Sequence, residues 1–221
     1  RIQVHPVLDC NWLQPMENSV DPTHSTYLHF GGTGKPVHGD GKRTIDKHDF
    51  EVFEHGIMKK RYVKNGSGEL EVVNAHPLVF PNMLRQRHGR RHYLEYRVPL
   101  DDTHTSVIQV YFTESKDGAN IDQPEDPPVE FLPPYKSDDG VRRMDQVMMQ
   151  DYMAWETAGA IYDRSREQLG AADRGILLYR KLLKEQLERV AAGKDPIAVI
   201  RDPALNRLVQ LETVTDSNYG D

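Results

Sequence analysis

The chain has 221 residues, of which 38% are hydrophobic and 28% are charged, and its formal net charge is -6. This length and composition predict one globular domain, residues 1–221, with a sizeable hydrophobic core. No apolar run is long enough to span a membrane, and Lys and Arg are mixed with acidic residues throughout, so we expect neither a membrane nor a nucleic acid as partner.

The start of the sequence and its cysteine content predict its context. The chain begins at Arg1 without a methionine, a signal peptide or another leader, so we expect it to be a piece of a longer protein. Its one cysteine is Cys10. This excludes an internal disulfide framework and fits a reducing cytoplasm, the location we expect.

The N-terminal segment predicts a short strand followed by a broken helix. Residues 1–9 alternate briefly between apolar and polar side chains, and Pro6 limits them to a connection or an edge strand. Helical periodicity runs from residue 11 to residue 29, with Pro15 and Pro22 inside it. Each proline removes an amide donor, so we expect each to kink or divide the helix.

Two histidines in this helix, His24 and His29, are candidate metal ligands, and Asp21 shortly precedes them. Two neutral imidazoles near one acid suggest a 2-His-1-carboxylate site. Residues five apart on an ideal helix stand about 140° from each other, so one ion can reach both only if the helix is kinked, widened or ending. We therefore predict a distorted helix between them. The alternative is one structural and one surface histidine.

The middle of the chain predicts an antiparallel meander. Residues 30–49 are rich in glycine and charge, which is typical of a loop that is either an active-site lid or an ordinary connection. Hairpin turns are expected at residues 65–68, 88–90 and 100–103. The predicted strands are Phe50–Val63, Glu69–Val73, Leu78–Arg87, Arg91–Leu100 and Thr103–Thr113.

Charged side chains are frequent on these strands and turns. We expect the histidines to be solvated or hydrogen-bonded, namely His55, His76, His88, His92 and His104. An inward-facing arginine would hold a substrate carboxylate, but we favour an exposed basic turn for the cluster of Arg85, Arg87, Arg90 and Arg91.

The last third of the chain predicts an extended arm and two helices. Residues 115–141 are rich in proline and acid, which indicates an arm in polyproline geometry. The helix expected over Val141–Tyr162 places Asp151 among large apolar side chains, where a carboxylate is costly to bury unless a metal ion pairs with it. The alternative is that Asp151 faces solvent. Gly170–Gly193 predicts a long amphipathic helix across the sheet.

The first helical segment resembles a motif of one enzyme family. Rieske non-haem iron oxygenases carry N-W…E-N-x-x-D-x-x-H-x-x-x-x-H in their catalytic domain, and this sequence is similar at Asn11, Trp12, Glu17, Asn18, Asp21, His24 and His29. Two later runs, Gln150–Thr157 and Asp163–Gly170, resemble the phthalate-dioxygenase-like branch of these aromatic-ring-hydroxylating alpha subunits. The middle of the chain resembles the family only in pattern.

The resemblance implies a role for several residues. It implies an iron triad of His24, His29 and Asp151, whose carboxylate comes from the first of the two later runs. Asp21 is implied as the bridge along which an electron arrives, and Asn18 as a neighbour of the open side of the iron. The residues that we expect to line a substrate pocket are Val20, Asn82, Met148 and Trp155.

The implied fold is an α+β helix-grip, START/SRPBCC-like domain, in which a long C-terminal helix packs on an antiparallel sheet. A Rieske 2Fe-2S cluster needs two cysteines and two histidines, which this chain cannot supply, so the resemblance places the cluster in a missing N-terminal domain. The implied partners are a reductase or ferredoxin that delivers NAD(P)H electrons, and further copies in a homotrimer, since a closed ring lets each cluster serve the next iron.

The implied activity is that of a terminal oxygenase. It would activate O2 at a mononuclear Fe(II) and hydroxylate an aromatic substrate, by mono- or dioxygenation, or demethylate it oxidatively; a facial triad leaves three coordination positions open for this. A zinc hydrolase is one alternative, although the H-E-x-x-H glutamate base is absent from the sequence. The other alternative is a START-like module that binds an apolar ligand without catalysis.

Overall fold

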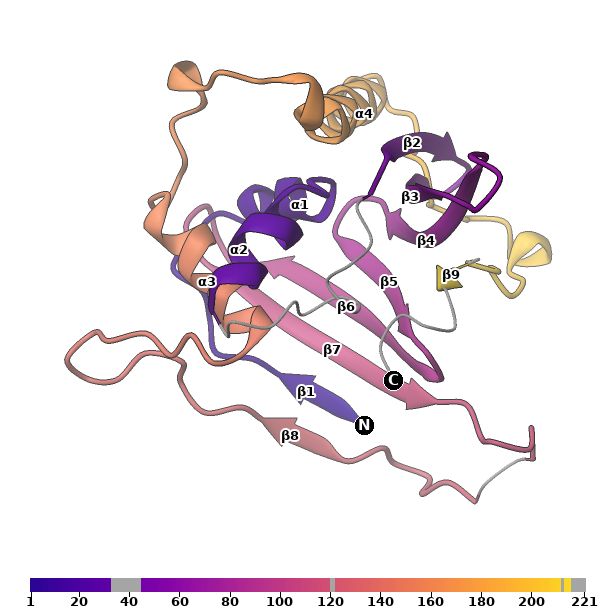
Figure 1. The fold of residues 1–221 in the computed structure, drawn as a ribbon, viewed down its shortest axis with the longest axis horizontal. Helices are drawn as coiled ribbons and strands as arrows, with labels where there is room; N and C mark the ends of the chain where they lie inside the picture. Colours follow the sequence, from indigo (N-terminus) through magenta and orange to yellow (C-terminus); the bar gives the residue numbers. More distant parts are fainter. Residues whose placement is uncertain (33–44, 120–121, 212, 216–221) are drawn as a thin grey trace.

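The protein has a mixed α+β architecture in which one large sheet is flanked by a group of three helices and by a separate long helix (Figure 1). The computed structural model describes residues 1–32, 45–119, 122–211 and 213–215. The helices are α1 (Leu13–Ser19), α2 (His24–Gly32), α3 (Val147–Thr157) and α4 (Arg174–Ala191). The strands are β1 (Ile2–Val4), β2 (Lys47–Phe53), β3 (Gly56–Lys64), β4 (Leu70–Val79), β5 (Met83–His88), β6 (Arg91–Pro99), β7 (Thr105–Thr113), β8 (Val129–Phe131) and β9 (Val214–Thr215).

The sheet is largely an antiparallel meander. Its described strands follow the order β2-β3-β4-β5-β6-β7-β1-β8, and β9 pairs with β4. Every pair from β2 to β7 is antiparallel, whereas β1 and β8 are parallel. The predicted α+β class, the meander and the three hairpin turns are therefore confirmed.

Two predicted strands each run across a turn that carries a weak signal. The run Phe50–Val63 is two strands, β2 and β3, which meet at Gly56 with a φ of +156°. A Cβ at Gly56 would lie 2.0 Å from the carbonyl oxygen of Leu78, so only glycine fits this approach. The run Leu78–Arg87 is also divided, since β4 ends at Val79 and β5 begins at Met83.

The N-terminal strand is not at an edge of the sheet, contrary to the prediction. Ile2 on β1 lies opposite Val110 of β7 on one side and opposite Val129 of β8 on the other. Pro6 follows the strand and so removes no ladder hydrogen bond. The short strand β8, within the Pro-rich arm, is the edge instead.

The prolines act differently in the first helical segment. The predicted division at Pro22 is present, because α1 ends at Ser19 and α2 begins at His24. The predicted break at Pro15 is wrong. Pro15 lies in the first turn of α1, where a backbone amide has no partner within the helix and its loss costs nothing.

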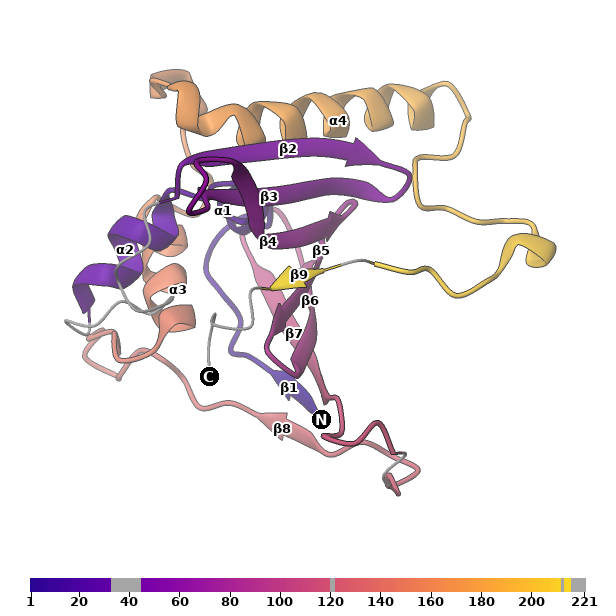
Figure 2. The same cartoon turned by 45° about the vertical axis from the view of Figure 1, so that its right-hand side comes forward.

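Helix α4 covers one end of the sheet and lies along β2 (Figure 2). Its Tyr179 and Leu182 enter the main core cluster, which also contains Met16, Val20, Ile57, Leu78, Phe80 and Leu84. Gly175 allows the helix to approach closely, since a Cβ there would lie 2.2 Å from the carbonyl oxygen of Val20. This contact fixes α1, and therefore the start of α2, against the sheet.

A second core cluster anchors α3. It consists of Leu8, Cys10, Val107, Tyr135, Tyr152 and Trp155. Helices α2 and α3 consequently lie side by side, as both cartoon views show. Of the predicted 30–49 loop, residues 33–44 lie outside the described part of the chain, and so do residues 216–221 of the C-terminal tail.

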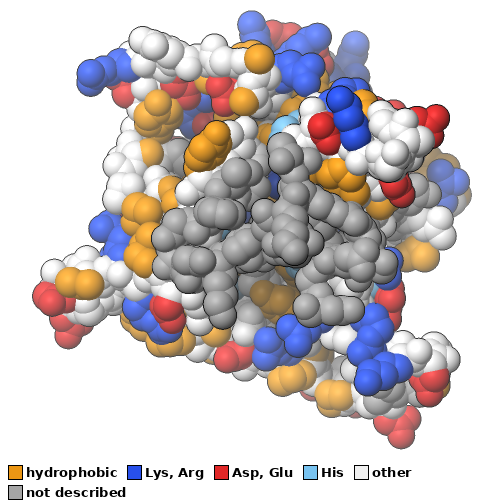
Figure 3. All heavy atoms as spheres, viewed as in Figure 1, with side chains coloured by type: hydrophobic (Ala, Val, Ile, Leu, Met, Phe, Trp, Pro, Cys, Tyr) orange, Lys and Arg blue, Asp and Glu red, His pale blue; other side chains and the backbone are white. Residues whose placement is uncertain are grey.

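The described surface is mixed in charge. In Figure 3, Lys and Arg side chains alternate with Asp and Glu around the rim of the visible face. Within the described ranges, no helix combines the length and the apolar content that crossing a membrane requires.

Candidate metal centre

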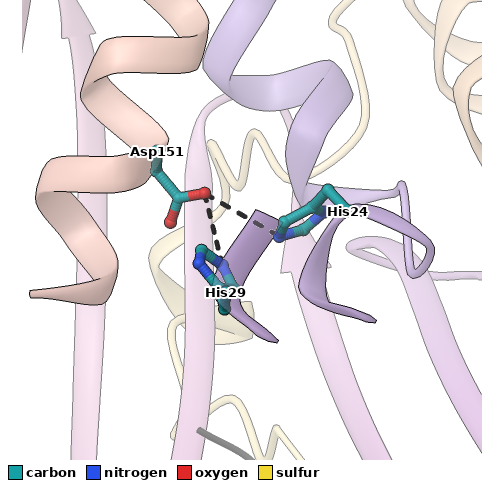
Figure 4. A group of neighbouring side chains, drawn as sticks. All are labelled: His24, His29 and Asp151. Carbon is teal, nitrogen blue, oxygen red and sulfur yellow. Dashed lines mark ion pairs between the residues drawn. The ribbon is translucent and has the colours of Figure 1, made fainter. Parts of the chain in front are cut away.

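Helices α2 and α3 bring His24, His29 and Asp151 together. The Oδ1 atom of Asp151 lies 3.9 Å from Nε2 of His24 and 3.5 Å from Nε2 of His29. Figure 4 shows the three side chains pointing toward one another, and their potential ligand atoms all lie within 4.8 Å. The resemblance implied this group, although Asp151 follows His29 by more than 120 positions in the sequence, and the structure brings the three side chains together.

The helix is not distorted between the two histidines, so that prediction is wrong. Helix α2 continues without a break from His24 to Gly32. His24 is its first residue, and its Nδ1–H donates back to the carbonyl oxygen of Asp21 at 2.5 Å. This bond holds the His24 ring at the helix start, where Nε2 of His24 and Nε2 of His29 both face Oδ1 of Asp151.

Asp21 builds this helix start. Its carboxylate accepts hydrogen bonds from the backbone amides of Thr23 at 2.7 Å and of His24 at 3.2 Å, as an N-cap residue does. One carboxylate oxygen also lies 3.7 Å from Nδ1 of His24. Asp21 therefore contacts a candidate ligand through both its side chain and its backbone.

Burial sets the protonation of the three residues. It lowers the pKa of His24 to about 2, with a further contribution from the charge of Lys59, and it also lowers the pKa of His29. It raises the pKa of Asp151 to about 8. Both imidazoles are therefore neutral at pH 7, as metal ligation requires.

The donor set fits a divalent cation. Oδ1 of Asp151 is buried and accepts no hydrogen bond from the described residues. Ligand atoms about 2.1 Å from one ion stand about 3.0–3.5 Å apart, close to the separations from this oxygen to the two Nε2 atoms. Two imidazoles and one carboxylate suit ferrous iron or zinc.

A cavity of about 380 Å³ opens beside the group. Asn18 and Met148 line it, among the residues expected near the iron and the substrate. Val20 and Trp155 belong instead to the two core clusters. The amide of Asn82 donates to the carbonyl oxygen of Arg97 at 3.0 Å, at the connection between strands.

The sequence did not predict four buried charged residues that line this cavity. Lys59 and Arg61 on β3 and Glu95 and Arg97 on β6 are all buried and line it. The available signal was their period of two, which places Lys59 and Arg61 on the same face as the buried Ile57. The basic residues considered from the sequence were instead the arginines at the β5–β6 hairpin.

The arginines of that hairpin lie mainly on the surface, in agreement with the exposed basic turn that we favoured. Arg87 pairs with Glu114 at 3.3 Å, and Arg90 donates to the backbone of the same residue. Two of the histidines on the strands, His76 and His88, line the cavity. Lys59 and His76 are register partners on β3 and β4, which brings both to the same place.

Glu17 joins the two segments that carry the sequence resemblance. Its carboxylate accepts from Arg164 at 2.9 Å and from Arg180 at 2.6 Å, and Arg180 also pairs with Glu167 at 2.6 Å. The carboxylate is 9% exposed, and its charge is balanced by the two guanidinium groups. Its position in the matched motif is therefore explained by packing of α1 against the segment that precedes α4.

Comparisons with known proteins find relatives over almost the whole chain. Residues 140–218 match a family described as LigXa C-terminal domain like. The 5,5'-dehydrodivanillate O-demethylase oxygenase subunit of Sphingobium sp. is 33% identical over 213 residues, 94% of this chain and 49% of that protein. The phthalate 4,5-dioxygenase oxygenase subunit of Pseudomonas putida is 23% identical over 260 residues, 96% of this chain and 56% of that protein. The chain is a homologue of Rieske-type oxygenase subunits.

The fold of this Rieske oxygenase homologue is also found in a solved structure. NdmA of Pseudomonas putida CBB5, determined with caffeine, aligns with a TM-score of 0.55 and 13% identity over 95% of this chain and 59% of that chain. At this identity the likeness shows the fold alone. The chain spans about half the length of the curated relatives it matches.

Proposed function

We propose that this chain is the catalytic domain of a terminal oxygenase that hydroxylates an aromatic substrate, or demethylates it oxidatively, at a mononuclear Fe(II) held by His24, His29 and Asp151. The observation that carries the proposal is the convergence of two neutral imidazoles on a buried carboxylate oxygen that has no hydrogen-bond donor among the described residues. Bound iron would supply the activation of O2.

The chain supplies ligands and a shaped cavity for this chemistry. Leu84 and Met148 offer apolar surface for an aromatic ring, and Asn18 offers an amide beside the candidate ligands. The names of the relatives support both reaction types, since one is an O-demethylase oxygenase subunit and another a dioxygenase oxygenase subunit. We extend these activities to this chain as part of the proposal.

The electron path and the assembly are further parts of the proposal. Electrons from NAD(P)H would pass through a reductase or ferredoxin to a Rieske 2Fe-2S cluster in a domain outside residues 1–221. Asp21 would form the bridge to the iron. Its side chain is 22% exposed while it contacts His24, so a partner can reach it from outside. A homotrimer, a helix-grip fold and a cytoplasmic location complete the proposal.

Metal identity tests the proposal. The chain, purified anaerobically with Fe(II), should hold close to one iron per chain by elemental analysis. His29→Ala should lose it, and His104→Ala, which changes an exposed histidine, should keep it. The full-length protein should then convert an aromatic substrate only with O2 and reductant. Zinc at full occupancy with oxygen-independent hydrolysis, or no metal at all, would contradict the oxygenase assignment and favour the hydrolase or the binding module.

A further inference from the structure

The cavity beside the candidate metal ligands contains a buried lysine. Lys59 lies on β3, is 9% exposed and lines the cavity. Its Nζ donates a hydrogen bond to the carbonyl oxygen of Ser19, at the end of α1, at 2.8 Å. An ammonium group has three donors, and this bond uses one of them.

The carboxylates that line the cavity interact with residues other than Lys59. Two carboxylates occur among its described lining residues, Glu95 and Asp151. Glu95 pairs with Arg97 at 2.7 Å, and Asp151 belongs to the candidate metal group. None of the carboxylates in the described ranges lies within 4.0 Å of Nζ of Lys59, whereas the neighbouring Lys60 pairs with Glu51 at 2.5 Å.

A buried cation without a close anion is unfavourable. Desolvation and the charge of Arg61 lower the pKa of Lys59 to about 7, although Asp21 and Asp151 act in the opposite direction. A protein retains such a group at a cost in stability, and an anionic ligand that enters the cavity would relieve this cost.

Arg61 extends the same surface. It is 8% exposed and lies two residues after Lys59 on the same face of β3. Its guanidinium donates to the amide oxygen of Asn74 at 3.2 Å and to the hydroxyl of Ser25 at 3.0 Å. These bonds hold the guanidinium plane in place at the cavity wall, on the same strand as Lys59.

We propose that Lys59, supported by Arg61, is an anion subsite that binds a carboxylate group of the substrate and so selects aromatic carboxylates for this cavity. The inference rests on the proposed function, which supplies the aromatic ring that is to be oxidised. A volume of about 380 Å³ suits a small ring compound. The candidate metal ligands line the same cavity as Lys59, so a ring whose carboxylate binds Lys59 would share the cavity with them.

Direct binding tests the subsite without turnover. The probes are benzoate, its methoxy derivatives and the corresponding benzamides, which keep the ring and remove the charge. Calorimetry under anaerobic conditions, on the Fe(II)-loaded chain, should show a preference for carboxylate of about tenfold or more, the equivalent of about 1.4 kcal/mol.

Variants assign the preference to Lys59. Lys59→Met keeps the aliphatic stem and should weaken carboxylate binding about 30-fold or more, with amide binding unchanged. Lys59→Arg should retain the preference. Lys60→Met, on the opposite face of the same strand, is the control and should leave both affinities unchanged. If Lys59→Met does not fold, the wild-type comparison and Lys59→Arg still decide.

Two results would overturn the subsite. Equal affinity of wild type for benzoates and benzamides would do so, and so would a preference that survives in Lys59→Met, since the carboxylate would then bind the metal. Iron content is measured in the same samples. Loss of iron with an intact preference counts against the oxygenase alone, and bound iron without a preference counts against the subsite alone.

Discussion

His29 donates its Nδ1–H to Oε1 of Gln150 at 3.0 Å. Gln150 lies on α3, directly before Asp151. The amide of Gln150 is oriented by its own bond to the carbonyl oxygen of Met144 at 2.9 Å, so its oxygen must face the histidine. This fixes the tautomer of His29 and presents its Nε2 toward Asp151. The residue before the candidate carboxylate ligand thus orients the candidate histidine ligand.

Gln150→Leu should weaken metal binding about 10- to 100-fold, because the imidazole loses the acceptor that holds its orientation. Metal titration followed by elemental analysis measures this. The matched control is Gln186→Leu on α4, another buried glutamine that accepts from a backbone amide, at Ile197. It should lower stability by a similar amount and leave metal affinity unchanged. Equal metal affinity in Gln150→Leu and wild type would contradict the orienting role.

Asp151 should make the metal-free protein less stable as pH rises. Its folded pKa, about 8, is above the ordinary value of 3.8, so the stability that its protonated form contributes is complete below pH 3.8 and is lost as pH rises through 8. Asp151→Asn removes this dependence. The difference in unfolding free energy, wild type minus variant, should fall by about 1.4 kcal/mol per pH unit between pH 5 and 7.

Chemical denaturation of chelator-treated protein at several pH values measures this difference, and the variant cancels the titration of the other groups. Added Fe(II) should abolish the decline for wild type, since the ion replaces the proton on the carboxylate. A difference that is flat across this range would show that Asp151 is already ionised in the metal-free protein.

The sequence predicted the elements better than their boundaries. The long helix with its apolar stripe and the hairpins with glycine turns were recovered, because periodicity and turn residues are local signals. The turns at Gly56 and near Pro81 were missed, and the glycine at the first of them is required by its close approach to Leu78 of β4. The place of β1 between β7 and β8 depends on pairing with residues more than 100 positions away.

The candidate ligands were recovered through the resemblance, whereas the rest of the cavity was not. Helical spacing alone argued against His24 and His29 as partners, yet both rings face Asp151 from α2, with His24 at the helix start next to Asp21. Lys59 and Arg61 looked like ordinary strand residues in the sequence. Their burial follows from the sheet face that α1 and α2 cover, which no local pattern contains.

Gly175→Ala should destabilise the protein by at least about 2 kcal/mol, because the added methyl group would overlap Val20 and Phe50. The backbone oxygen of Val20 cannot move without shifting α1. Thermal and denaturant unfolding measure the effect. Gly66→Ala is the control: no atom lies within 4 Å of a Cβ there, so its stability should stay within about 0.5 kcal/mol of wild type. An unchanged midpoint for Gly175→Ala would contradict the close packing of α4.

Glu17→Gln should lower the unfolding free energy by about 2–4 kcal/mol, since two arginines would share a neutral partner; their partial exposure keeps the loss below that of a fully buried pair. Glu188→Gln breaks an exposed pair with Lys184 on α4 and should cost about 0.5 kcal/mol or less. Denaturant titrations of both variants give the comparison. Equal losses would show that the Glu17 network contributes no more than a surface pair.

Asp21→Asn separates the structural role of Asp21 from its proposed electron-transfer role. Asparagine caps a helix as well as aspartate, so stability and iron content should remain close to wild type, whereas Asp21→Ala should lose about 1 kcal/mol with the cap. Asp101→Asn is the matched control, an exposed aspartate that accepts from the amide two residues on. In the full-length protein, Asp21→Asn should abolish NAD(P)H-driven turnover while Asp101→Asn retains it. Turnover at the wild-type rate in Asp21→Asn would leave Asp21 as a helix cap and no more.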